Sequence, residues 1–66
     1  MPRGKQHDET GILLANGFYP KLQRADGGEW RLDITKRYRH LLGRAVRVVG
    51  IRAEFDLLEV QHISAI

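Results

Sequence analysis

The hexapeptide EWRLDI, residues 29–34, constrains the fold more strongly than any other segment. Trp30, Leu32 and Ile34 alternate with charged residues, and this period of two is typical of a β-strand with one face in a core and the other in water. Asp26 and two glycines precede the segment, which indicates a tight hairpin turn because glycine adopts positive φ angles without strain. A strand that enters from a hairpin predicts an antiparallel sheet.

Further segments of alternating character lie on both sides of this strand and are separated by turn residues. Pro20, in the segment before it, removes one backbone donor and therefore favours an edge or a bend over a central position. The chain is expected to be mainly β, with five strands at residues 10–15, 18–25, 29–34, 44–55 and 56–66.

The last two expected strands contain signs of irregular register. Val46 and Val48 are predicted to point into the core on either side of an arginine. Gly50 then lies where a β-bulge would turn Ile51 inward as well, whereas without a bulge Ile51 would face solvent. Ile63 is also out of phase with the apolar residues before it, which predicts a second register shift.

The residues between the third and fourth strands, TKRYRHLLG, change to helical spacing. Thr35 is a suitable N-cap, and Gly43 stands where a left-handed C-terminal cap is common. Tyr38, Leu41 and Leu42 have the spacing of one apolar stripe. A helix of about eight residues has little stability in water on its own, so this one is expected to dock on the sheet.

The expected order of elements is three strands, one short helix and two strands. This is the arrangement of the OB-fold, a small five-stranded Greek-key barrel. Closure of the sheet also suits a short chain, because it removes exposed strand edges that invite aggregation. An SH3-like barrel is the main alternative, although it does not ordinarily place a helix at this point.

The length and composition of the chain set further limits. Its 66 residues suffice for one domain, expected at residues 10–66, and residues 1–9 are polar and aperiodic, which predicts a flexible N-terminal leader. The absence of cysteine excludes disulfides, thiolate metal sites and cysteine nucleophiles. No apolar run approaches the roughly 20 residues of a membrane span, and no secretory signal is visible, so a cytoplasmic location is expected.

Four segments together show a pattern of glycines and inward apolar residues: TGILL (Thr10–Leu14), DGGEWRLD (Asp26–Asp33), LLGRAVRVVG (Leu41–Gly50) and LLEVQHI (Leu57–Ile63). In these segments the chain resembles a group of very short bacterial OB-like β-barrel domains of uncharacterised function. The shared positions are nearly all glycines and core residues. The resemblance therefore implies a fold and supplies no functional residue.

The segment after the third strand is strongly basic. Between Ile34 and Ala53 there are six lysines and arginines and no acidic residue, in a chain of net charge +3. Such a surface would bind the phosphates of nucleic acid with an affinity that falls as salt rises. The alternative is a solvated basic face with no ligand. The nucleic-acid interpretation rests on Lys36, Arg37, Arg39, Arg44 and Arg47.

Binding of single strands without sequence preference also uses exposed aromatic rings on which bases stack. The outer face of residues 29–34 offers charged side chains and no ring, because Trp30 is predicted to point into the core. Tyr19 is therefore the candidate stacking residue. Phe18 beside it is the alternative, since both rings cannot point inward from one strand.

No arrangement of catalytic or metal-binding residues stands out. His7, His40 and His62 lack the spacing of metal ligands, and no serine or threonine has a base and an orienting acid placed for catalysis. No enzymatic activity, cofactor, small-molecule substrate or membrane association is expected. The chain is expected to be a small binding module for single-stranded DNA or RNA. The alternative is a protein-interaction or self-associating module that uses an open strand edge or outward apolar groups such as Val49.

Overall fold

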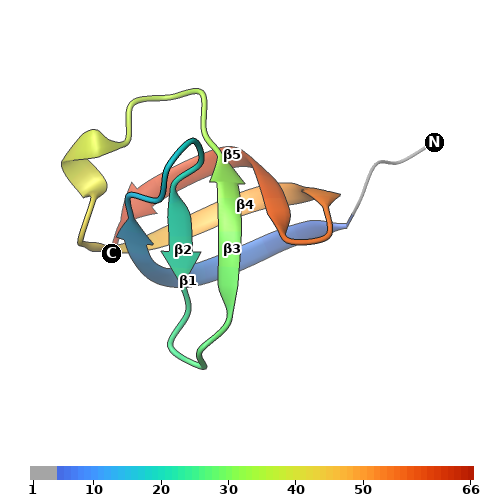
Figure 1. The fold of residues 1–66 in the computed structure, drawn as a ribbon, viewed down its shortest axis with the longest axis horizontal. Helices are drawn as coiled ribbons and strands as arrows, with labels where there is room; N and C mark the ends of the chain where they lie inside the picture. Colours follow the sequence, from blue (N-terminus) through green and yellow to red (C-terminus); the bar gives the residue numbers. More distant parts are fainter. Residues whose placement is uncertain (1–4) are drawn as a thin grey trace.

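A computed structural model describes residues 5–66. Within this range five strands form one sheet that closes on itself in the order β1-β2-β3-β5-β4, with β4 next to β1 (Figure 1). Neighbouring strands are antiparallel except β3 and β5, which run parallel. The prediction of a mainly β chain with five strands is confirmed. The strands are β1 (Gln6–Leu14), β2 (Lys21–Gln23), β3 (Glu29–Asp33), β4 (Ala45–Glu54) and β5 (Leu57–Ala65).

Strand β1 begins earlier than expected. Residues 6–9, predicted to belong to a flexible leader, instead form the first part of β1 and pair with β4. His7 and Glu9 are half-buried while their neighbours are exposed, so the alternation of a strand is present without apolar residues to reveal it. This corrects the predicted leader for residues 6–9, and residues 1–4 lie outside the described residues.

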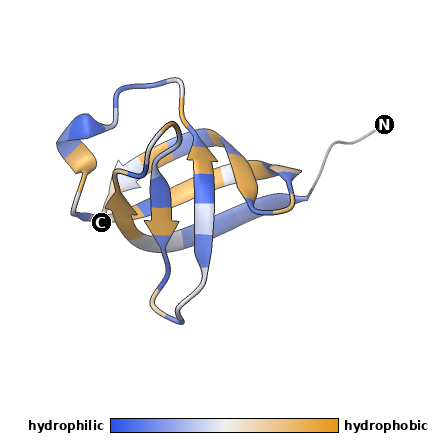
Figure 2. Cartoon of the chain, viewed as in Figure 1, coloured by the Kyte–Doolittle hydropathy of each residue, from blue (hydrophilic) through white to orange (hydrophobic). Residues whose placement is uncertain are grey.

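The core consists of aliphatic side chains contributed by every strand, and Figure 2 shows hydrophobic and hydrophilic bands alternating along the strands. Leu32 is fully buried, and Trp30 and Ile34 pack against the core from partly buried positions, as the alternation in β3 predicts. Among the described residues no polar or charged side chain is buried. The fully buried side chains are Leu13, Leu22, Leu32, Val46, Val48 and Leu58.

A register shift bends the long β4–β5 pair. Gly50 faces Val60, and Gln61 is left as an extra residue in β5. The shift allows Val60 and Ile63 both to pack against the core, which confirms the shift predicted from Ile63. The bulge expected at Gly50 thus lies on the partner strand, and Ile51 is half-buried on the outer side of β4.

The prediction of a helix between the third and fourth strands is wrong. The chain forms a single 3₁₀ turn, η1 (Arg39–Leu41), and Thr35 does not cap it. Tyr38 occupies the capping position and makes no side-chain capping hydrogen bond. The segment is too short for a stable α-helix, and no acidic residue in its first turn compensates the helix dipole. Gly43 has a φ of 81°, so the left-handed residue is where the sequence predicted it.

Candidate functional site

The connection between β3 and β4, residues 34–44, is called the basic loop below and projects from one end of the closed sheet (Figure 1). Leu41 anchors the loop because its side chain is part of the core. Two backbone hydrogen bonds fix its return to the sheet. The Gly43 N–H donates to the Leu13 carbonyl at 2.6 Å, and the Leu13 N–H donates to the Arg44 carbonyl at 3.1 Å. The loop is therefore held firmly at its C-terminal end.

The basic loop contains cations without acidic partners. Lys36, Arg37, Arg39 and Arg44 are exposed, and in the part of the chain that the structure describes they form no ion pair. Lys36 Nζ makes one long hydrogen bond, of 3.5 Å, to the carbonyl of Gln61. The rest of the described chain has six lysines and arginines against eight acidic residues. The net positive charge of the described residues therefore lies in this loop.

Four cations of the sheet and its β2–β3 hairpin, by contrast, lie beside carboxylates. Arg31 on β3 donates to Asp56 through two nitrogens, at 2.6 and 3.0 Å, and lies 3.5 Å from Glu54. Arg52 differs, because it donates to backbone carbonyls and lies over the ring of Phe55. Pairing of this kind cancels much of the field that an approaching anion would meet. The four pairs are Lys21–Glu29, Arg24–Asp26, Arg31–Asp56 and Arg47–Asp8.

Arg47, one of the five basic candidates, belongs to the sheet rather than to the basic loop. It lies on β4, exposed, and donates two hydrogen bonds to the Asp8 carboxylate on β1. These bonds hold the pKa of Asp8 below its ordinary value and raise the pKa of Arg47. Because its charge is compensated, Arg47 contributes less to the attraction of an anion than the loop cations do.

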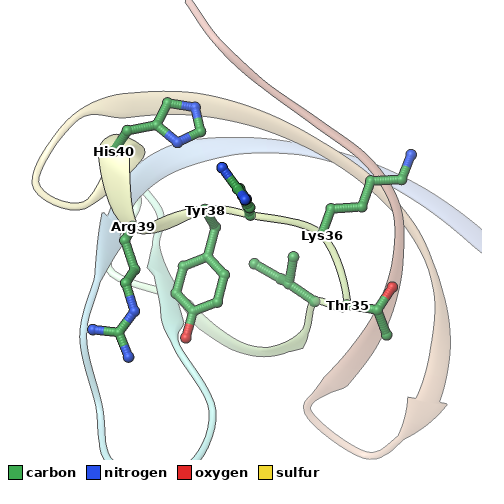
Figure 3. Close-up of a pocket in the computed structure, with 7 residues that line it drawn as sticks. Thr35, Lys36, Tyr38, Arg39 and His40 are labelled. Carbon is green, nitrogen blue, oxygen red and sulfur yellow. The ribbon is translucent and has the colours of Figure 1, made fainter.

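Residues 34–40 of the basic loop line an open hollow of about 500 Å³. In Figure 3 the ring of Tyr38 points into the space beneath the loop, while Lys36 extends from one side of the bend and Arg39 from the other. The lining combines apolar and aromatic groups with cations and contains no carboxylate. The lining residues are Ile34, Thr35, Lys36, Arg37, Tyr38, Arg39 and His40.

The connection between β1 and β2 lies beside the basic loop, and the two connections line a second hollow of about 120 Å³. Tyr19, the predicted stacking residue, lies in this connection but lines neither hollow. It is half-buried, and the Arg31 guanidinium lies 5.7 Å from its ring centroid. The rings of Phe18 and Tyr19 meet edge-on, with 4.9 Å between their centroids. Phe18 is 89% exposed, so it is the more accessible of the two rings.

The sequence interpretation did not predict that Tyr38 would line a hollow. Its place in the predicted apolar stripe made it a packing residue, and it does pack against the core. It also lines both hollows, with cations on each side of it in the sequence. In the segment KRYR the tyrosine lies between basic residues, which was the available sign that its ring would lie at a cationic surface.

Across residues 5–66 no three histidine or acidic side chains converge on a metal position. The histidines are dispersed, with His7 on β1, His40 in η1 and His62 on β5. In that same stretch no helix has the length and apolar character needed to cross a bilayer. The absence of enzymatic activity and of a cofactor, and the cytoplasmic location, stay predictions.

These features define a small β-domain whose closed five-stranded sheet carries a positively charged connection between β3 and β4. A family model described as "Protein of unknown function (DUF5818)" matches residues 10–66, and because the match covers most of the chain, the chain belongs to this family. The match agrees with the resemblance to a short uncharacterised domain. Searches of curated proteins and of solved structures gave no match.

Proposed function

We propose that the closed sheet is an OB-like Greek-key barrel. Support comes from its five strands, its closure, and the connection that leads from β3 past β5 to β4. Barrels of this class bind oligonucleotides and oligosaccharides, so the fold leaves several ligand classes open. The charge distribution has to decide among them.

We further propose that the domain binds single-stranded DNA or RNA through phosphate contacts to the basic loop. One observation carries this proposal: Lys36, Arg37, Arg39 and Arg44 are exposed and have no carboxylate partner among the described residues, whereas Arg47 on the sheet is paired. An unpaired cation meets a phosphate without first giving up an ion pair. Contacts to phosphate read no bases, so the binding tolerates sequence changes.

The type and placement of these charges favour phosphate. Three of the four loop cations are arginines, whose planar fork donates two parallel hydrogen bonds to a phosphate group. Outside the loop the described residues carry an excess of acidic side chains, which repels a polyanion. The strand of nucleic acid is therefore directed to the loop end of the sheet.

A titration of a fluorescently labelled single strand of about 12 nucleotides, followed by anisotropy, tests this proposal. Four phosphate contacts predict a fall in affinity of roughly 50-fold between about 50 and 200 mM salt, because each neutralised phosphate releases counterions. Absence of binding at the lower salt, or an affinity independent of salt, contradicts the proposal.

A second candidate function is association with a protein, and two exposed aromatic rings favour it. Phe18 is 89% exposed and Phe55 is 85% exposed, and aromatic residues are enriched at protein interfaces. Arg31 links their two loops, since it contacts Tyr19 beside Phe18 and Asp56 beside Phe55. Pairing through an open strand edge lacks support, because each described strand pairs on both sides.

Sedimentation velocity over a concentration series tests self-association, with the double variant Phe18→Ser and Phe55→Ser as the comparison. A dimer that the variant abolishes supports this second candidate. A monomer at every concentration excludes self-association through these rings.

A further inference from the structure

We infer that the hollow of the basic loop receives one unstacked base of a single strand, with Tyr38 as the stacking ring. Lys36, Arg37 and Arg39 would contact the phosphates on either side of that base. The inference rests on the proposed function and adds a base contact that phosphate binding alone does not require. It also moves the stacking position from Tyr19 to the loop.

The hollow has the size and lining that a base requires. Its volume of about 500 Å³ lies within the range of about 300–1,000 Å³ of pockets that bind small ligands. Ile34 supplies an apolar wall, and the ring of Tyr38 is directed into the space beneath the loop (Figure 3). A nucleobase has apolar faces and polar edges, so it matches an aromatic ring beside an apolar wall.

The charges around the hollow select a nucleotide over other flat ligands. Arg37 and Arg39 immediately flank Tyr38 in the sequence, Lys36 precedes Arg37, and no carboxylate lines the hollow. An uncharged aromatic ligand would leave these cations uncompensated. A base within a strand brings a phosphate on each side, so ring and cations are satisfied together. Arginine guanidinium planes also stack on bases.

The same geometry separates single strands from duplexes. A base that enters the hollow has to leave its stack, and in a duplex this costs unpairing as well as unstacking. The phosphates of a duplex remain accessible to the loop cations, so a duplex binds through charge alone. The base contact is therefore available to a single strand and not to an intact duplex.

The test compares two ligands that have the same number of phosphates: an oligothymidylate of about 12 nucleotides and an abasic strand of that length. If a base stacks in the hollow, the abasic strand binds roughly 5- to 150-fold more weakly. If both strands bind equally and lose affinity with salt, the proposed function stands and this inference is overturned. If neither strand binds at low salt, both proposals fail.

Variants of Tyr38 locate the contact. Tyr38→Phe keeps the ring and is expected to bind oligothymidylate as the unaltered protein does, whereas Tyr38→Leu keeps apolar packing against the core and loses the preference for the normal strand over the abasic one. Circular dichroism establishes that each variant is folded. A preference that persists in a folded Tyr38→Leu variant places the base elsewhere and overturns the inference. If Tyr38→Leu fails to fold, equal binding of the normal and abasic strands by the unaltered protein still overturns the inference.

Discussion

Trp30 has an aromatic ring that packs against the core and a polar N–H group that lacks a hydrogen-bond partner among the described residues. Its indole packs against the core from β3, and the ring of His7 lies 5.0 Å away. The indole Nε1 is nevertheless buried and has no hydrogen-bond partner among the described residues. A buried donor that lacks a partner costs about 1–3 kcal/mol. The ring therefore stabilises the fold while its N–H group opposes part of that effect.

This balance makes Trp30→Phe much milder than Trp30→Ala. The phenylalanine keeps an aromatic ring and removes the unpaired donor, so we expect the free energy of unfolding to change by less than about 1 kcal/mol. The alanine loses the ring, and a reduction of about 3–5 kcal/mol is expected. Urea unfolding followed by circular dichroism measures both. If Trp30→Phe and Trp30→Ala lowered the free energy of unfolding equally, the N–H group would be making a favourable interaction.

The Arg31–Asp56 pair predicts a dependence of stability on pH. The hydrogen bonds from Arg31 hold the pKa of Asp56 below its ordinary value of 3.8. A carboxyl group with a lowered pKa in the folded state stabilises the fold above its unfolded pKa, and this contribution is lost as the pH falls through the folded value. The unaltered protein should therefore exceed Asp56→Asn in stability near neutral pH, with the difference shrinking below about pH 4. Urea unfolding across this range measures it, and a difference that stays constant in acid contradicts the assignment.

Two glycines show how single positions shape the elements. Gly43 ends the 3₁₀ turn with a φ of 81°, and no atom lies within 4 Å of the place where a Cβ would stand. Gly50 in β4 has no positive φ, but a Cβ there would lie 2.7 Å from the carbonyl oxygen of Glu59 on β5. The turn therefore needs the conformational freedom of glycine, whereas the strand needs its small size.

Alanine and asparagine should rank oppositely at these two positions. Asparagine adopts the left-handed conformation more readily than alanine, so Gly43→Asn is expected to be milder than Gly43→Ala, which costs about 1–2 kcal/mol. At Gly50 the larger side chain adds to the clash, so asparagine is worse than alanine, which itself costs about 1–3 kcal/mol. Thermal unfolding of the four variants gives the ranking. If asparagine and alanine ranked in the same order at both positions, the two glycines would not be required for different physical reasons.

The elements also show what a sequence pattern can predict. Leu32 and its strand were predictable because the two-residue period is set directly by one buried face. His7 and Glu9 were not, because their inward positions on β1 are polar and give no alternation in hydropathy. The helical spacing of Tyr38 and Leu41 reflects real contacts with the core, but an irregular segment and one short 3₁₀ turn make them. Local spacing thus identified the packing residues and not the backbone that presents them.

Some features of the candidate site were also predictable from the sequence, and others were not. The sequence correctly predicted that Lys36 and its basic neighbours would be exposed, since hydrophilic residues between two apolar segments seldom lie in a core. It did not predict that Arg47 would be paired, because Asp8 is 39 residues away and becomes its neighbour only when β1 lies beside β4. The hollow was also unpredictable, because it depends on the loop path that replaced the expected helix.

On the scale of the whole molecule, charge is separated between two regions. Four of the six described lysines and arginines outside the basic loop lie beside carboxylates, whereas the basic loop, which projects from one end of the sheet, has no ion pair among the described residues. The net charge of +3 alone would describe many small proteins that bind no polyanion. We propose that the concentration of positive charge in one loop makes a local binding surface, and two variants of equal net charge test this proposal.

The loop variant and the sheet variant each replace three cations by glutamine and lower the net charge from +3 to zero. The loop variant changes Lys36, Arg37 and Arg39. The sheet variant changes Lys21, Arg24 and Arg47.

The most direct measurement is the affinity of both folded variants for one labelled single strand at about 50 and 200 mM salt. If the unpaired loop cations form the binding surface, the sheet variant keeps the affinity of the unaltered protein within about threefold. The loop variant binds far more weakly at the lower salt. Its affinity then falls by only about a further threefold when the salt is raised, because one loop cation remains. Equal losses in the two variants would show that total charge governs binding and would contradict the account.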